Sequence, residues 1–348
     1  MRIQGANGKD AQVYYDVDLE AGPIGIGGMG QVFKAKRISE ITGKGTDVAI
    51  KFLFDNLPLS AIERAKREAS IRIQHENLIE MIDFIQIEEH AQNGDVIVRN
   101  HVVSELLRGV MLFDLLHNNI KETPDGTQVE FAEQLLNLYK TDRLSFSLKV
   151  IKNILSGIMA LHDKGYIHRD IDPSNIMVTI DEKIKIIDFG IAREINQLEK
   201  SDRQLTSFGQ FVGKAEYAAP ELVLGDVNNQ NVTTDLYAIG ILLFEFITGQ
   251  LPFTGSINDV IKQQQTADIP LKFIENKKLR KIIAKATAKK QSERFQSAAE
   301  FRTAIEQFEN GKDDEDRSQV YSIVKQSGIW LGIASVGLAI GVLLNYLI

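Results

Sequence analysis

The spacing of the apolar residues changes near Leu107, and this change restricts the fold more than any other feature of the sequence. Before Leu107 apolar and polar residues alternate over short runs, which is typical of strands. After Leu107 apolar residues recur every three or four positions over longer runs, which is typical of helices. A chain with strands in its first third and helices in the remainder favours an α+β fold.

The individual elements follow from these two spacings. The predicted strands are Gln12–Leu19, Gly30–Arg37, Asp47–Phe52, Asp83–Glu88 and Val96–Glu105. One helix, Ala61–Ile73, lies among them, and Ser60 with Glu63 predicts a capping box at its start. The helices predicted after Leu107 are Ser147–Lys164, Asp235–Thr248 and Ser297–Phe308. A short hairpin follows a polar cluster and consists of Ile176–Ile180 and Lys183–Ile187.

Composition excludes several classes of protein. Of the 348 residues, 44% are apolar and 25% are charged, which are the proportions of a globular protein. The formal net charge of −7 argues against a protein that coats nucleic acid, so we expect no nucleic-acid partner. The absence of cysteine excludes disulfides, thiolate catalysis and cysteine-bound zinc or iron–sulfur sites.

The C-terminal segment 328–348 contains no charged residue. As a helix it would reach ~31 Å, about the thickness of the hydrocarbon core of a bilayer. A buried core helix is the other interpretation, but no polar stripe interrupts the run, so we expect a membrane span. Lys312, Arg317 and Lys325 precede the segment and no Lys or Arg follows it. This bias predicts a single-pass membrane protein with its folded part in the cytoplasm, and the N-terminus shows no signal peptide.

Four closely spaced glycines, Gly25, Gly27, Gly28 and Gly30, form the first candidate site. Without Cβ atoms their backbone N–H groups can approach a polyphosphate closely. The same spacing opens dinucleotide-binding folds, but there the last glycine begins a helix, and here a predicted strand follows. The pattern therefore favours a phosphate-covering hairpin between two strands.

Side chains with the chemistry of phosphoryl transfer follow in order along the chain. Lys51 ends the strand segment Val-Ala-Ile-Lys, where it can hold ATP phosphates, and Glu68 on the predicted helix can pair with it. Asp170 follows His-Arg and can accept the proton of an attacking hydroxyl. Asn175 and Asp188 supply oxygen ligands of the kind that Mg²⁺ prefers.

Together these residues make the chain resemble the eukaryotic-type protein kinases over residues 13–308, about 85% of its length. The segment GIGGMGQVFKA is most similar to the bacterial membrane-bound serine/threonine branch. Further matches are Ala219-Pro220-Glu221, Asp235 with Gly240, TGQLPF and Arg294. The resemblance implies that Glu221 and Arg294 form a structural ion pair, and that Asp235 braces the backbone of the catalytic loop.

The resemblance also implies a two-lobed protein kinase fold, with a small lobe that is mainly β with one helix and a larger lobe that is mainly α. The predicted divisions are an N-terminal extension at 1–12, an N-lobe at 13–107, a C-lobe at 108–308, a polar linker at 309–327 and a transmembrane helix at 328–348. The stretch 118–143 is longer than the family's usual connection at that point, and no role follows for it.

By the same resemblance the chain would use ATP with Mg²⁺, or with Mn²⁺ in its place. The backbone of Glu105 and Leu107 would bind adenine, and Val32 and Ala49 would pack on its ring. Ser104 would be the gatekeeper residue beside the adenine. An ordinary buried strand is the other interpretation of the same residues.

Two positions depart from the family pattern. Most serine/threonine kinases have lysine two residues after the catalytic aspartate and threonine after the glycine of the peptide-positioning loop. This chain has Asp172 and Lys214 at these positions. Both positions neighbour the catalytic carboxylate in the family, so we expect Lys214 to pair with Asp172 and to supply the cation lost at position 172. The departures leave open whether serine/threonine or tyrosine hydroxyls are used.

Two functions therefore compete. The preferred one is a membrane-tethered protein kinase that transfers the γ-phosphate of ATP to serine or threonine hydroxyls of protein substrates. The alternative is a catalytically weak or dead kinase fold that serves as a membrane-anchored binding module.

Thr206, followed by Ser207, is the expected activating phosphorylation site. Both residues lie between Asp188 and Glu221, and Arg169 supplies a cation able to pair with an added phosphate.

The predicted membrane helix also carries glycines four residues apart, at Gly328 with Gly332 and at Gly337 with Gly341. This spacing permits close packing of two helices, so a homodimer through the membrane segment is expected.

Overall fold

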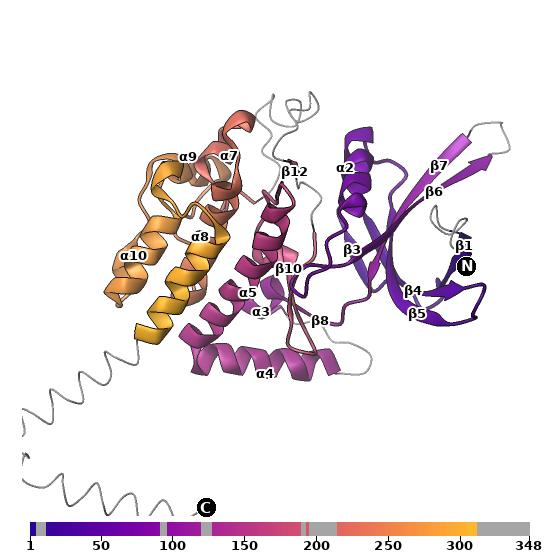
Figure 1. The fold of residues 1–348 in the computed structure, drawn as a ribbon, viewed down its shortest axis with the longest axis horizontal. Coiled ribbons are helices and arrows are strands. Elements are labelled where there is room, and N and C mark those ends of the chain that lie inside the picture. The colour runs from indigo at the N-terminus through magenta and orange to yellow at the C-terminus, as the bar shows by residue number, and fades with distance from the viewer. Residues whose placement is uncertain (5–11, 91–95, 120–126, 189–192, 195–213, 312–348) are drawn as a thin grey trace, which may run out of the picture. The chain divides into compact units, whose positions relative to one another are not determined.

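The computed structural model describes residues 1–4, 12–90, 96–119, 127–188, 193–194 and 214–311 (Figure 1). The predicted membrane segment 328–348, with its four glycines, lies outside the described residues. Thr206 and Ser207 also lie outside them.

The first part of the chain forms a seven-stranded antiparallel sheet. Its strands run in the order β1-β2-β4-β5-β7-β6, and β3 pairs with β4. The bounds are β1 (Arg2–Gln4), β2 (Val13–Val17), β3 (Gly25–Gly27), β4 (Gly30–Ser39), β5 (Gly45–Leu53), β6 (Met81–His90) and β7 (Val96–Glu105). All five predicted strands are therefore present, with ends shifted by a few residues.

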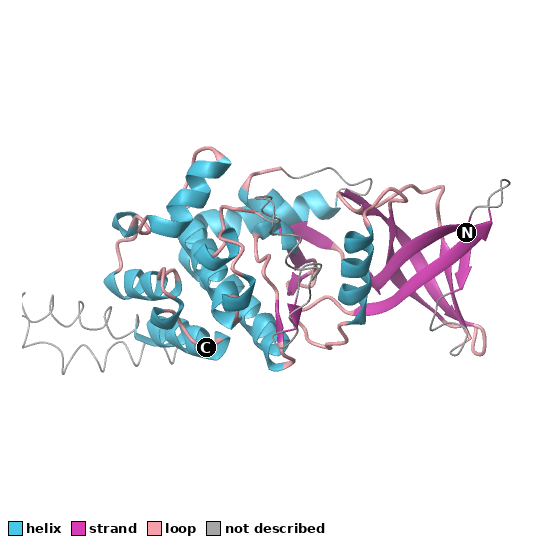
Figure 2. Ribbon diagram, turned by 90° about the horizontal axis from the view of Figure 1, so that it is seen from above, coloured by secondary structure: helices cyan, strands magenta, loops and turns pink. Residues whose placement is uncertain are grey.

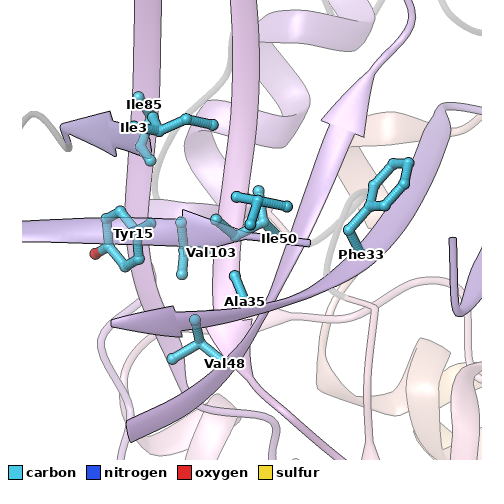
Figure 3. Packing of buried hydrophobic residues seen from close by; sticks show 9 residues of the cluster. Ile3, Tyr15, Phe33, Ala35, Val48, Ile50, Ile85 and Val103 are labelled. Carbon is cyan, nitrogen blue, oxygen red and sulfur yellow. The ribbon is translucent and has the colours of Figure 1, made fainter. Parts of the chain in front are cut away.

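One face of this sheet forms an apolar core, and Figure 3 shows its side chains converging. The cluster consists of Ile3, Tyr15, Val17, Phe33, Ala35, Val48, Ile50, Ile85 and Val103. Because side chains alternate along a strand, Val48 and Ile50 point into this core while Ala49 and Lys51 project from the other face. Burial on one face thus fixes the register that presents Lys51 to the opposite side.

The N-terminal residues differ from the expectation of an extension over 1–12. Arg2–Gln4 forms β1, which pairs with β2 from Arg2 opposite Asp16 to Gln4 opposite Tyr14. Ile3 is only 2% exposed because it completes the apolar cluster of the sheet. The sheet therefore includes Arg2–Gln4 as well as the strands after residue 13.

Helix α2 (Leu59–Ser70) replaces the predicted helix Ala61–Ile73. The residue before it is Pro58 at φ −64°, and no side chain caps the helix, so the predicted capping box of Ser60 with Glu63 is wrong. Pro58 is the N-cap and has an extended backbone, so the helix begins at Leu59, two residues earlier than predicted, and Ser60 lies inside its first turn.

The second part of the chain is mainly helical, as Figure 2 shows in cyan. Its helices are α3 (Leu112–Leu116), α4 (Thr127–Thr141), α5 (Arg143–Asp163), α7 (Pro220–Val223), α8 (Val232–Thr248), α9 (Ile257–Thr266) and α10 (Lys277–Ala286), followed by a helix over 298–311. A small sheet has the order β11-β10-β8, with β8 (Gly109–Met111), β10 (Ile176–Thr179) and β11 (Ile184–Ile186). Strand β9 (Tyr166–Ile167) pairs with β12 (Arg193–Glu194). The predicted hairpin is thus present as β10 and β11.

The stretch 118–143 contains an additional helix, α4. Tyr139 on α4 donates a hydrogen bond to the carbonyl of Phe246 at 2.8 Å, which attaches α4 to α8. Helix α5 then begins a turn earlier than predicted, because the carboxylate of Asp142 accepts a hydrogen bond from the backbone N–H of Ser145.

Among the described residues, only α5 is long and apolar enough to cross a membrane. Ten of its residues are buried, including Ile151, Ile154 and Ile158. Helix α5 contacts α8 and β11 in the same folded unit, so it is a core helix of that unit.

A buried ion pair joins α7 to the segment after α10, as the family resemblance implied. Arg294 donates from both terminal nitrogens to Glu221, at 2.8 and 2.9 Å. Arg294 also donates to the carbonyls of Thr233, Ala288 and Lys289. Five hydrogen bonds therefore satisfy a guanidinium that is 1% exposed, which matches the requirement for a charge removed from water.

Glu221→Ala is expected to lower the free energy of unfolding by about 3–5 kcal/mol, because it leaves the buried guanidinium of Arg294 without a counter-ion. Urea unfolding followed by far-UV circular dichroism tests this, since the single tryptophan, Trp330, lies in the segment 328–348. The matched control is Glu293→Ala, which removes an exposed pair with Lys290 and should cost less than about 1 kcal/mol. Equal losses in the two variants would contradict the assignment.

Candidate active site

The loop that carries Asp170 is held by Asp235, which lies in the first turn of α8. One oxygen of Asp235 accepts from the backbone N–H of His168 at 2.8 Å, and the other accepts from that of Arg169 at 2.7 Å. The imidazole of His162 on α5 also donates to Asp235 at 2.8 Å. Asp235 therefore holds the backbone of this loop, as the family resemblance implied.

The carboxylate of Asp235 that holds this loop stays ionised. Burial raises the pKa of Asp235, but the hydrogen bond and charge of His162, together with His168, hold that pKa below its usual value. Burial lowers the pKa of His168, and the Nδ1 atom of this ring accepts from the backbone N–H of Asp170 at 3.3 Å. His168 is accordingly neutral and completes the turn into Asp170.

The braced loop contains a strained residue. Arg169 has φ +69°, a conformation that costs a residue with a Cβ atom of order 1–3 kcal/mol. Its side chain donates to Gln230 at 3.3 Å. The hydrogen bond from its backbone to Asp235 offsets the strain and fixes the backbone next to Asp170.

Asp170 lies beside the two predicted metal ligands. The side-chain nitrogen of Asn175 donates to the backbone carbonyl of Asp170 at 2.8 Å and to its carboxylate at 3.2 Å. Burial raises the pKa of Asp170 to about 7, and the charges of Asp172 and Asp188 add to the rise, whereas Asn175 and Lys214 lower it. A carboxylate with this pKa is a better proton acceptor than an ordinary aspartate.

The two positions that depart from the family pattern lie in direct contact. The ammonium of Lys214 is 2.7 Å from Asp172 Oδ1 and 2.8 Å from Ser174 Oγ. It also lies 4.5 Å from the centre of the Phe113 ring, within range of a cation–π interaction. Asp172 is 2% exposed, so it would be a buried charge without a counter-ion if Lys214 were absent.

Asp172 has a second role in the backbone of the loop. Its Oδ1 accepts from the backbone N–H of Ser174 at 2.6 Å and so caps the short 3₁₀ turn Pro173–Asn175. Ser174 Oγ also donates to the same oxygen at 2.6 Å. Ser174 is a site residue that sequence reasoning missed, because a serine two residues from an aspartate is common in turns.

The glycine segment forms β3 and its turn into β4. A Cβ atom at Gly25, Gly27 or Gly28 would have nothing within 4 Å, so these positions face open space. A Cβ atom at Gly30 would lie 2.1 Å from the carbonyl oxygen of Phe52, so only glycine fits there. Val32 lies opposite Lys51 in the ladder of β4 with β5, and Ala49 lies opposite Ser104 in that of β5 with β7.

The predicted hinge carries an ion pair that the sequence did not indicate. The carboxylate of Glu105 is 2.6 Å from the ammonium of Lys185, which also donates to the carbonyl of Leu78 at 3.0 Å. Ser104 Oγ donates to the carbonyl of Glu105 at 3.2 Å. The backbone N–H of Glu105 also donates to the carbonyl of Glu80 at 2.9 Å. The second lone pair of the Glu105 carbonyl is therefore the group of this residue that remains for a nucleotide.

The predicted ion pair between Lys51 and Glu68 is not formed among the described residues. Glu68 is 7% exposed and lies on the buried face of α2 with Ala61, Ala65 and Ala69, where it makes contacts of its own. Lys51 is half-buried on β5. The structure thus places both residues on the predicted elements without bringing their charges together.

The donor set next to Asp170 fits a magnesium ion. The nitrogen of the Asn175 amide is turned to Asp170 and Asp172, which leaves its oxygen as a ligand atom. The carboxylate of Asp188 is close enough to raise the pKa of Asp170. No group of three or more histidine, aspartate or glutamate residues in the described part of the chain could hold a metal by itself. An amide and a carboxylate would therefore hold the ion together with phosphate oxygens.

The segment after Lys214 is anchored from two helices. Gln264 on α9, fully buried, donates to the carbonyls of Ala215 and Glu216 at 3.0 and 2.6 Å. Tyr217 donates to the carboxylate of Glu245 on α8 at 2.7 Å. The same segment lines a small pocket with Asp170, Asp172 and Leu222. Sequence reasoning missed Gln264 and Tyr217, because neither carries a motif of its own.

Comparison with known proteins identifies the family to which a chain with these site residues belongs. A family model described as the protein kinase domain matches residues 20–309. The chain belongs to the protein kinase family, as the order of its motifs predicts.

Several bacterial kinases are among its relatives. It is 29% identical over 301 residues to the serine/threonine-protein kinase PknB of Mycobacterium tuberculosis, covering 84% of this chain and 43% of that protein. It is 30% identical over 297 residues to the probable serine/threonine-protein kinase PknB of Bifidobacterium longum, covering 83% and 39%. It is 30% identical over 256 residues to the serine/threonine-protein kinase pkn2 of Myxococcus xanthus, covering 72% and 26%. The chain thus spans less than half the length of each of these relatives.

Asp235→Asn is expected to release the catalytic loop, because an amide offers one acceptor oxygen where the carboxylate offers two. One of the backbone N–H groups of His168 and Arg169 then loses its partner, at about 1–3 kcal/mol. Hydrogen exchange followed by mass spectrometry should show faster exchange across 166–172. Asp226→Asn, which alters an exposed contact with Asn229, is the control and should leave that peptide unchanged. Equal protection in the two variants would show that Asp235 is not the brace.

Proposed function

We propose that the chain is an active protein kinase that transfers the γ-phosphate of ATP to serine or threonine hydroxyls of proteins. The observation that supports it most directly is the grouping of Asp170 and Asn175, on a loop fixed by Asp235, with Asp188, whose charge raises the pKa of Asp170. Lys51 and the four glycines lie on the strands that would face the nucleotide. The alternative of a dead binding module gains no support, since each of these residues is retained.

The chemistry that this grouping permits is an in-line transfer. The substrate hydroxyl oxygen forms a bond to the γ-phosphorus while the bond from that phosphorus to the bridging oxygen of ADP breaks. Asp170 accepts the hydroxyl proton at its carboxylate. Mg²⁺, held by Asn175 and Asp188, would neutralise charge on the phosphate oxygens. Lys51 would orient the phosphates, Val32 and Ala49 would cover the adenine ring, and the backbone of Glu105 and Leu107 would hydrogen-bond to it.

Lys214 is assigned to the catalytic set as the cation that replaces the family's missing lysine. It lies in the same hydrogen-bonded group as Asp172 and Ser174, and its charge lowers the pKa of Asp170. Without Lys214, the carboxylate of Asp172 would repel an incoming phosphate and raise the proton affinity of Asp170 further.

The uncharged segment 328–348 is proposed to anchor the kinase as a single membrane-spanning helix, with the kinase domain on the cytoplasmic side. Its length and the lysines and arginine before it support this arrangement. Gly328 with Gly332, or Gly337 with Gly341, would let two such helices pack and bring two kinase domains together. Thr206 or Ser207 is the proposed target of the resulting trans-phosphorylation.

Phosphate transfer by the purified full-length chain tests the function. With Mg-ATP and dephosphorylated casein we expect phosphoserine and phosphothreonine, and phosphopeptide mapping should find Thr206 or Ser207 of the chain itself modified. Asp170→Asn, which removes the proton acceptor but preserves the shape of the side chain, is the blank. ATP binding without transfer above this blank would establish the binding module instead, and phosphotyrosine alone would overturn the hydroxyl specificity.

A double-mutant cycle tests the exchange at positions 172 and 214. Lys214→Ala should lower kcat by ~10²-fold or more, the scale of losing one group that stabilises the transition state. Asp172→Lys combined with Lys214→Thr should recover part of that loss, since it restores the family's arrangement. Lys149→Ala, which breaks an exposed pair with Glu182, is the control and should leave kcat unchanged. Strictly additive effects, or near-normal turnover in Lys214→Ala, would refute the exchange.

A further inference from the structure

Helix α10 has an unusual composition for a surface helix. Its ten residues, KKLRKIIAKA, include five basic residues and no acidic residue. Leu279, Ile282, Ile283 and Ala286 are buried, and the helix packs on α8. The opposite side of α10 is therefore a row of basic side chains with no carboxylate on the same helix.

Four of the five basic side chains of α10 point to solvent, and the fifth, Arg280, is half-buried and donates to the carbonyl of Glu275. Lys277, Lys278, Lys281 and Lys285 are all exposed. Lys277, Lys281 and Lys285 follow one another at a spacing of four, so like charges lie one turn apart and repel. Lys285 is neutralised by Glu300 at 2.5 Å. Lys277 and Lys281 have no ion-pair partner among the residues that the structure describes.

An exposed aromatic residue precedes this helix. Phe273 is 56% exposed, and the ammonium of Lys272 lies 5.2 Å from the centre of its ring. We call Lys272, Lys277, Lys278 and Lys281, with Phe273, the basic face. Exposed aromatic rings among lysines are characteristic of surfaces that contact the headgroup region of a bilayer.

The basic face stands out against the charge of the whole chain. From Lys272 to Arg302 there are ten basic and three acidic residues, a net charge of +7, whereas the chain as a whole carries −7. The rest of the chain therefore carries −14. A segment of this sign in an otherwise acidic protein is a candidate for an anionic partner.

We propose that the basic face binds the anionic phospholipid surface of the membrane that anchors the chain. This inference rests on the proposed membrane helix at 328–348. The cytoplasmic surface of a membrane is negatively charged, and each exposed lysine near it strengthens binding by roughly fivefold. Lys277 and Lys281 supply positive charge that the described residues leave uncompensated.

The membrane anchor brings the kinase close to the bilayer but does not determine which side of the kinase contacts it. Between the last described residue and the uncharged segment lie residues 312–327, which can extend at most roughly 55 Å at ~3.5 Å per residue. A folded unit of about 300 residues has a radius of gyration of about 19 Å. The linker can therefore bring different sides of the kinase to the bilayer, and the charge of each side decides which one stays there.

Two other anionic occupants are possible for the same face, and they differ in what they predict. The linker itself contains Asp313-Asp314-Glu315-Asp316 and would bind in the absence of anionic lipid. A nucleic acid would compete with lipid for the lysines. The membrane is favoured over a free nucleic acid because the anchor keeps it at high effective concentration, and anionic lipid separates it from the linker in the experiment below.

A single fluorescent label tests the contact, because the chain has no cysteine of its own. Ala284→Cys places the label on the exposed side of α10, and Thr46→Cys places it at an exposed position on β5 as the control. Each labelled full-length chain is reconstituted into phosphatidylcholine vesicles with 0 or 30 mol% phosphatidylglycerol and a headgroup-linked acceptor. Energy transfer from position 284 should at least double with phosphatidylglycerol and fall again in 0.5 M NaCl. Position 46 should show no such change.

Charge reversal provides the matched comparison. Lys277→Glu with Lys281→Glu should abolish the response to phosphatidylglycerol, whereas Lys36→Glu with Lys44→Glu, which changes the net charge equally at exposed N-lobe positions, should preserve it. Transfer from position 284 that is independent of phosphatidylglycerol overturns the proposal. If that transfer is salt-sensitive, the linker is the occupant of the basic face. If duplex DNA or RNA, added at the same total charge as the phosphatidylglycerol, abolishes the lipid-dependent signal, a nucleic acid is the occupant.

Flotation and phosphotransfer on the same samples keep the proposals apart. Flotation with phosphatidylcholine alone reports the membrane helix. Flotation only with phosphatidylglycerol would refute that helix while supporting the basic face, and no flotation would overturn both. Lipid-dependent transfer in a chain without phosphotransfer would support the contact and refute only the proposed catalytic activity.

Discussion

The carboxylate of Asp235 is the contact on which the catalytic loop depends. It lies in the first turn of α8, whose start is fixed by a reciprocal capping box between Asn231 and Thr234. From there it accepts from two consecutive backbone N–H groups and from His162 on α5, so one side chain ties two core helices to the loop. The strained backbone of Arg169 persists because these bonds over-determine it. A loop with little regular structure of its own thereby acquires the rigidity of the helices behind it.

The charges around Asp170 show why the exchange of Asp172 and Lys214 matters. A lysine and a threonine at these positions carry one positive charge, whereas the ion pair here carries none. Lys214 donates hydrogen bonds to Asp172 and Ser174 and lies over the Phe113 ring. Because the charge of Asp172 partly cancels that of Lys214, the attraction of Lys214 for an incoming phosphate is reduced. The same deficit of positive charge contributes to the raised pKa of Asp170, which makes that residue a stronger proton acceptor. Weaker attraction for phosphate and stronger basicity are thus two results of one substitution pair.

The order of elements could be predicted from the sequence because it depends on local patterns. Alternation gave the strands, whereas Lys51, Asp170, Asn175 and Asp188 were proposed from the order of their motifs and from the resemblance to protein kinases. The pairing of Glu105 with Lys185 could not be predicted, since 80 residues separate them and neither spacing nor composition marks the contact. The start of α2 was misjudged because Ser60 suits an N-cap by residue type, whereas Pro58 is the N-cap and no side chain caps the helix. The Lys51–Glu68 pair was expected from motif order, but order does not determine how α2 packs against β5.

Charge also relates the proposed anchor to the rest of the chain. A kinase domain with an evenly distributed negative charge would be repelled by an acidic bilayer, and its linker would allow it to stay away from the membrane surface. Here the acidic charge outside 272–302 and the basic charge within it give the domain an electrostatic polarity. Near an anionic surface such a domain experiences a torque as well as a force, because the basic face is attracted while the acidic remainder is repelled. Both effects weaken together as salt rises, since the Debye length of about 8 Å at physiological ionic strength is short compared with the domain. Orientation at the membrane would then be set by α10, and the anchor would set only proximity.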